Sequence, residues 1–150
     1  FEFVKVVNAP TPGGAGWARH VFYETGDGQI AFWELHDPTL PAFDAAISTS
    51  QGLPEWVNHL AFSSTLEDLG PRRERWLDRG IDVADIDHEF CRSLYAMDPN
   101  GILVEFCADV RPLDERDRAH AEATLFDPSP PMEPIKEPVF HQARRAEVAG

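Results

Sequence analysis

The sequence has little positive charge and no long apolar run. Thirteen basic residues stand against 26 acidic ones, and the formal net charge is −13. Such a charge repels phosphate groups, so we expect neither nucleic acid nor an anionic membrane as a partner. No stretch approaches the roughly 18 apolar residues of a membrane-spanning helix, and the first residues carry no signal-peptide pattern. These absences predict a soluble protein of the cytoplasm.

Cysteine is also scarce, and several catalytic motifs are missing. The two cysteines, Cys91 and Cys107, lie in strand-like runs. Two thiols do not form a disulfide framework, so we interpret them as small core residues in a reducing compartment. The sequence contains no Gly-x-Ser-x-Gly motif, no P-loop and no dinucleotide-binding fingerprint. With 43% hydrophobic and 11% aromatic residues, its 150 residues are nevertheless sufficient for one domain with a core.

A similar phrase occurs twice, at 27–35 and at 98–106. In both copies a turn containing glycine opens an apolar run, and one carboxylate, Glu34 or Glu105, interrupts that run seven positions after an aspartate. A buried carboxylate must be paired, protonated or bound to a metal. The repetition therefore predicts that the two carboxylates share one site.

The strand and helix patterns around these phrases indicate a repeated unit. Residues 56–108 show the order strand, helix, strand, strand, strand, whereas residues 1–36 show only three strands, and 37–55 reads as a linker. The sequence begins without Met, directly in a strand pattern. We therefore expect that the first copy lacks its opening strand and helix in this sequence. The expected strands cover 1–7, 17–23, 30–35, 56–62, 81–86, 93–97 and 102–107, and the expected helix contains Leu66, Leu69, Trp76 and Leu77 and ends at Gly80.

The character of the sequence changes over 109–150. A charged segment at 111–123 predicts a short helix, and five prolines between 128 and 138 then disfavour regular structure. We interpret the remainder as a disordered or surface-draped tail. Its scattered apolar residues leave open an arm that packs across the domain or onto a partner subunit, so a homodimer is a second expectation.

Residues 1–108 resemble the vicinal oxygen chelate superfamily, which includes glyoxalase I, the extradiol dioxygenases and the bleomycin and fosfomycin resistance proteins. The resemblance lies in the two copies of the βαβββ pattern, in Asn58-His59-Leu60-Ala61-Phe62, and in Ser93–Gly101 followed by Val104-Glu105-Phe106. It implies an α+β fold in which paired βαβββ modules form a cup-shaped mixed sheet around a divalent metal.

The resemblance also implies a ligand set. His59 matches the ligand on the first strand of the second module, Glu105 the ligand on its last strand, and Glu34 the last-strand position of the first module. The fourth ligand would lie on the strand that this sequence lacks. For His59 the alternative is a hydrogen-bonded core histidine, and for Glu34 a carboxylate on the solvent side of an edge strand.

The residues themselves support such a site independently. Strand alternation places Glu105 on one face with Leu103 and Cys107, and places His59 on one face with its neighbours two positions away. One imidazole and two carboxylates suit Fe²⁺, Mn²⁺, Ni²⁺, Zn²⁺ or Mg²⁺. A small-molecule substrate would then bind the metal through two neighbouring oxygens.

Further polar residues are candidates for proton transfer. Glu34, Tyr95 and His20 could orient a substrate oxygen or move a proton. Alternation separates His20 from Tyr23, so only one of them can face the metal. Tyr95 could instead be a half-buried aromatic residue of its strand. His88 could close the mouth of the cup, but a position in a solvated loop is the favoured interpretation.

Three functions remain open. The first, slightly favoured because Glu34 adds a second carboxylate, is a glyoxalase-like lyase or isomerase. The second is an extradiol dioxygenase with Fe²⁺ held by His59, Glu105 and a missing histidine. The third is a drug-binding resistance protein of the bleomycin type without catalysis, against which His59 and Glu105 argue.

Overall fold

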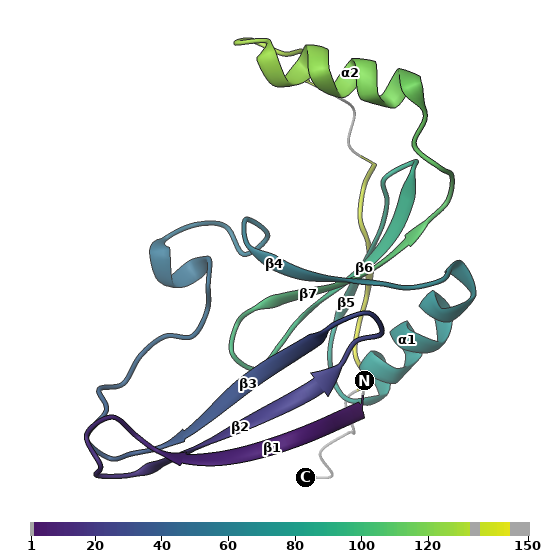
Figure 1. The fold of residues 1–150 in the computed structure, drawn as a ribbon. Helices are drawn as coiled ribbons and strands as arrows, with labels where there is room; N and C mark the ends of the chain where they lie inside the picture. The colour runs from purple at the N-terminus through teal and green to yellow at the C-terminus, as the bar shows by residue number, and fades with distance from the viewer. Residues whose placement is uncertain (1, 133–135, 145–150) are drawn as a thin grey trace, which may run out of the picture. The chain divides into compact units, whose positions relative to one another are not determined.

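A computed structural model describes residues 2–132 and 136–144, and the chain divides into two compact units, Phe1–Asp44 and Ala45–Gly150. Each unit contains its own sheet, and the second also contains two α-helices (Figure 1). The predicted α+β class is therefore confirmed. Within the described ranges, no helix is long and apolar enough to cross a membrane.

The first unit is a three-stranded antiparallel sheet in the order β1-β2-β3. Its strands are β1 (Glu2–Pro10), β2 (Trp17–Glu24) and β3 (Gln29–His36). The predicted Gly-rich turn joins β2 to β3, with Gly26 at a φ of +114° and a hydrogen bond from the Thr25 amide to the Gly28 carbonyl oxygen of 3.0 Å. All three predicted strands of this unit are present, each slightly longer than expected.

The second unit contains the predicted order of strand, helix and three strands, closed by a further strand at one edge. Its five-stranded sheet has the order β4-β7-β6-β5-β8, with β4 parallel to β7 and the other pairs antiparallel. The elements are η1 (Thr49–Gln51), β4 (His59–Ser63), α1 (Leu66–Asp78), β5 (Val83–Asp87), β6 (Cys91–Met97), β7 (Leu103–Asp109), α2 (Glu115–Phe126) and β8 (Val139–His141).

Helix α1 covers one face of this sheet (Figure 1). The Thr65 hydroxyl caps the helix by accepting a hydrogen bond of 3.2 Å from the Asp68 amide, as expected for a hydroxyl at this position. Apolar residues of α1 and of alternate positions in β5, β6 and β7 form the core. They are Leu69, Leu77, Val83, Leu94, Phe106 and Ala108, with Phe62 and Trp76 packed against them.

Most predicted boundaries in the second unit are displaced by a few residues, and two of the displacements have local causes. The strand expected at 56–62 begins only at His59, because the Val57 amide closes a turn onto the Pro54 carbonyl oxygen at 3.1 Å. The helix expected at 111–123 spans 115–126 instead. Asp114 forms a capping box with Asp117 at its start, and Pro112 precedes the cap.

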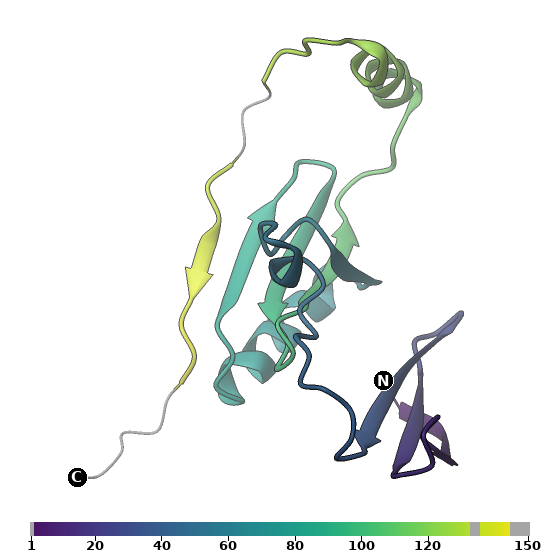
Figure 2. The same cartoon turned by 90° about the vertical axis from the view of Figure 1, so that its left-hand side faces the viewer.

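The expectation that no regular structure follows the prolines is wrong for 139–141. This segment forms β8, which pairs antiparallel with β5 (Figure 2). Side chains from distant parts of the unit hold it in place. Lys136 Nζ lies 2.9 Å from Asp87 Oδ2, the Ala143 amide donates to Asp82 Oδ1 at 2.7 Å, and Arg144 pairs with Glu74 and Asp78. The last part of the tail, 145–150, lies outside the described residues.

Candidate functional site

The face of the second sheet opposite α1 carries the polar candidates. Strand alternation turns Leu94 and Phe106 towards α1, so their neighbours Tyr95 and Glu105 point to the other face. The strand register also aligns one residue from each strand in a single row across that face. From one edge to the other, the row is Phe140, Ala84, Tyr95, Glu105 and Ala61.

His59 and Glu105 form the centre of the site. His59 Nε2 lies 3.0 Å from Glu105 Oε2; the Glu105 side chain is 8% exposed and that of His59 35%. The other ring nitrogen, Nδ1, lies 3.2 Å from the Trp56 carbonyl oxygen and can only donate to it. Nε2 therefore faces a carboxylate, which is favourable only if a proton or a metal cation lies between the two atoms.

Tyr95 binds the second oxygen of the same carboxylate. Its hydroxyl donates to Glu105 Oε1 at 3.0 Å, and His88 Nε2 lies 3.1 Å from the hydroxyl oxygen. Because Tyr95 uses its one proton towards Glu105, His88 must be the donor in the second bond. Burial, together with the adjacent Glu105 charge, raises the pKa of Tyr95 well above its usual range. Tyr95 is therefore a stable neutral donor.

The turn before β7 explains the aspartate of the second copy of the repeated phrase. Asp98 Oδ1 accepts hydrogen bonds of 2.8 Å from the amides of Asn100 and Ile102. Gly101 has a φ of +76°, and a Cβ atom there would lie 2.9 Å from Ala46 Cβ. The phrase is thus the turn and second strand of a hairpin, and it sets the register of Glu105 opposite Tyr95.

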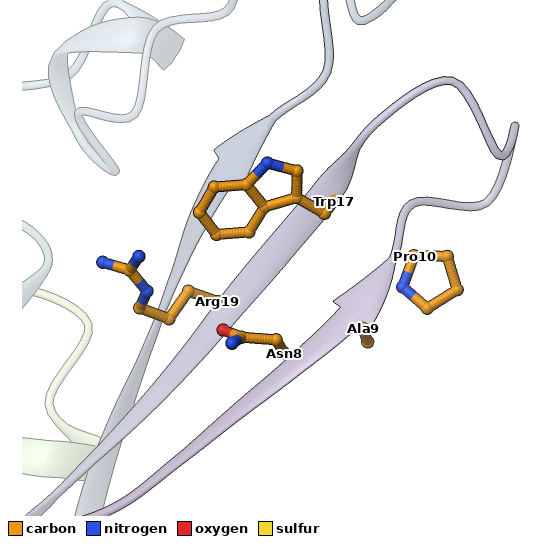
Figure 3. Close-up of a pocket in the computed structure, with 5 residues that line it drawn as sticks. All are labelled: Asn8, Ala9, Pro10, Trp17 and Arg19. Atoms are coloured by element: carbon orange, nitrogen blue, oxygen red, sulfur yellow. The ribbon is translucent and has the colours of Figure 1, made fainter.

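Glu34 lies in the first unit, within an ion-paired cluster of its own. Arg19 Nη1 donates to Glu34 Oε2 at 3.0 Å, and His36 Nε2 lies 2.6 Å from Glu34 Oε1. Trp17 stacks on His36 with ring centroids 3.9 Å apart. Trp17 and Arg19 also line a shallow pocket with Asn8 (Figure 3). Glu34 is half exposed and already has two partners.

His20 and Tyr23 lie on opposite faces of the first sheet, as alternation predicts. Tyr23 shares the face of Glu34 and contacts Phe32 edge to face, with ring centroids 6.0 Å apart. His20 is on the other face and stacks on Trp33 at 3.9 Å. Within this unit, therefore, Glu34 and His20 do not face the same side.

Of the predicted site residues, the structure brings together His59, Glu105 and Tyr95. Over 2–132 and 136–144 it contains no group of three or more histidine, cysteine, aspartate or glutamate side chains arranged to hold a metal ion. The donors that do converge are one imidazole nitrogen and one carboxylate oxygen. They fit two positions of a divalent metal site and leave its other positions to further ligands.

Sequence reasoning undervalued His88. Instead of a solvated loop position, this side chain is the outer member of the hydrogen-bonded chain His88, Tyr95, Glu105 and His59. The alternation of β5 could have predicted this position. Ala84 and Ile86 lie on the open face, and His88, two positions further on, is expected on the same face.

Both cysteines are free thiols on this face. Burial, followed by the neighbouring Cys107, raises the pKa of the Cys91 thiol from 9.0 to about 11. The neutral thiol is therefore favoured in the folded state, as expected for a small core residue.

This shift predicts a loss of stability at alkaline pH. Below pH 9 the thiol is neutral in both the folded and the unfolded chain, whereas between pH 9 and 11 the unfolded chain ionises first, so the free energy of unfolding falls. Urea unfolding at pH 8 and pH 10 measures the effect. Between these pH values, the free energy of unfolding should decrease less in Cys91→Ala than in the wild type. Ser48→Ala, at an equally buried position without a titratable group, is the control. An unchanged decrease in Cys91→Ala would contradict the assignment.

No family model, curated protein or solved structure matches the chain. The residues and their geometry therefore carry the functional proposal.

Proposed function

We propose that the protein is a metal-dependent enzyme of the vicinal oxygen chelate type that acts on a small, oxygen-rich organic substrate. Lyase or isomerase chemistry of the glyoxalase kind is the favoured reaction class. The observation that supports the proposal best is the approach of His59 Nε2 to Glu105 Oε2 at 3.0 Å on the open face of a βαβββ sheet.

The surroundings of His59 fit a metal ligand. Metal-binding histidines commonly donate their other ring N–H to a backbone carbonyl or a carboxylate, and the Trp56 carbonyl oxygen accepts such a bond here. His59 and Glu105 would hold Fe²⁺, Mn²⁺, Ni²⁺, Zn²⁺ or Mg²⁺. When bound, such an ion polarises two neighbouring oxygens of a substrate as a Lewis acid.

The remaining groups of the site would orient the ligand and move protons. Tyr95 fixes Glu105 through Oε1, which leaves Oε2 directed towards His59. His88 and Tyr95 form a hydrogen-bonded path along which a proton could reach Glu105. The sequence pattern predicts Glu34 as the proton-transfer group for lyase or isomerase chemistry and as a further metal ligand.

An extradiol dioxygenase is the second candidate, and the contacts of Glu34 favour it. Arg19 and His36 already engage both oxygens of this carboxylate. A site with His59, Glu105 and a further histidine would match the two-histidine, one-carboxylate set of non-haem Fe²⁺ oxygenases.

Metal analysis of the Glu34→Gln variant distinguishes the two candidates. If Glu34 is a ligand, the variant should bind less metal than the wild type, whereas Glu24→Gln, an exposed carboxylate on the same sheet, should not. Full metal content in Glu34→Gln would favour the dioxygenase if the Fe²⁺-loaded protein also consumes O₂ with catechol as the substrate. A wild-type protein that binds no divalent metal would overturn both.

A further inference from the structure

A second pocket lies beside Tyr95, where the C-terminal strand joins the sheet. Residues of β5 to β8 line it, including Ala84, Tyr95, Met97, Leu103 and Phe140. The lining is mainly apolar, and it includes the β8 segment that the prolines had been expected to leave irregular. Phe140, His141 and Gln142, in the segment that pairs with β5, form part of the pocket wall.

The strand register places a small residue between two aromatic ones. Ala84 lies opposite Phe140 on one side and opposite Tyr95 on the other. Neighbouring strands are about 4.8 Å apart, so Phe140 and Tyr95 start about 10 Å from each other with only a methyl group between them. This spacing suits a flat group lying above Ala84 between the two rings.

Phe140 is unusually exposed for an aromatic residue in a strand. It is 76% exposed, although polar contacts on both sides of β8 anchor the segment that carries it. Tyr95 is only half buried. Both rings can therefore offer surface to a ligand.

The charged residues of the pocket favour a positively charged ligand. Glu55 and Asp82 also line it, and no lysine or arginine does so among the described residues. The one basic lining residue, His141, directs Nε2 towards Asp85, 3.8 Å away, on the face covered by α1. Carboxylates beside exposed rings attract an organic cation through charge and cation–π interactions, and the net charge of −13 acts in the same direction.

We propose that this pocket binds an organic cation with a flat apolar body, such as an arylalkylammonium ion. The site goes beyond the proposed function: it shares Tyr95 with the His59–Glu105 centre but requires no metal. Phe140 supplies the aromatic wall of the pocket, and the small side chain of Ala84 leaves room for the ligand. Glu55 and Asp82 supply the negative charge.

Three probes of equal ring size test the proposal on the full chain in the presence of EDTA. Calorimetry or ligand-observed NMR should rank benzylammonium first, benzyl alcohol second and benzoate last. Phe140→Ala should weaken benzylammonium about threefold to tenfold. Glu55→Gln should weaken benzylammonium but not benzyl alcohol. Phe126→Ala, which removes a similarly exposed ring from α2, should change nothing.

Equal affinities for the three probes, no binding of benzylammonium, or equal effects of Phe140→Ala and Phe126→Ala would each overturn the proposal. These outcomes are separable from a failure of the metal site. Because the probes lack neighbouring oxygens and EDTA removes the metal, benzylammonium binding is measured without any contribution from metal affinity.

Discussion

Replacing Leu94 with alanine is expected to lower the free energy of unfolding by about 3 kcal/mol. Leu94 is 1% exposed and lies on β6, inside the cluster formed by α1 and the sheet. Its truncation would remove buried methyl groups and leave a cavity beside Leu69 and Phe106. Chemical denaturation at pH 7 measures the effect.

The control for Leu94 is Leu125→Ala on α2, where the side chain is 77% exposed. That variant should change the free energy of unfolding by less than about 0.5 kcal/mol. Similar losses in the two variants would show that α1 and β6 do not form the stabilising core. Because Tyr95 and Glu105 depend on the same strands for their position, the Leu94 result also tests the scaffold of the site.

Replacing Glu105 with glutamine is expected to weaken divalent metal binding at least about 100-fold. The amide keeps the size of the side chain and can still accept the Tyr95 hydrogen bond, but it removes the negative charge that faces His59. His59→Ala should have an effect of the same order. Tyr95→Phe, which leaves the ligands intact and removes only the donor to Oε1, should cost about tenfold.

Calorimetric titration with Mn²⁺ or Zn²⁺ measures these affinities, and Glu122→Gln is the control for a lost surface carboxylate. Equal metal affinities in Glu105→Gln and Glu122→Gln would contradict the assignment.

Much of the second unit could be predicted from sequence because its signals are local. Alternation in β6 and β7 separates Tyr95 and Glu105 from the core residues Leu94 and Phe106. The Asp98 turn then sets the register of the two strands. For this reason the pairing of Tyr95 with Glu105 follows from short-range features alone.

The parts that could not be predicted depend on contacts between distant segments. Strand β8 is only three residues long and follows a proline, so its own sequence carries no strand pattern. Its position depends on Asp82 and Asp87, which lie some fifty to sixty positions earlier in the chain. In the first unit, the ion pairs of Glu34 with His36 and Arg19 likewise depend on side-chain rotamers and on the cross-strand register, and residue type alone does not predict them.

Mn²⁺-induced broadening of side-chain NMR signals tests the central claim most directly, because it reports which residues contact the ion. At substoichiometric Mn²⁺, the His59 ring and the Glu105 carboxylate should broaden first, followed by Tyr95. Broadening that begins at exposed carboxylates such as those of α2, while His59 and Glu105 stay sharp, would show nonspecific binding to an acidic surface and contradict the proposed metal site.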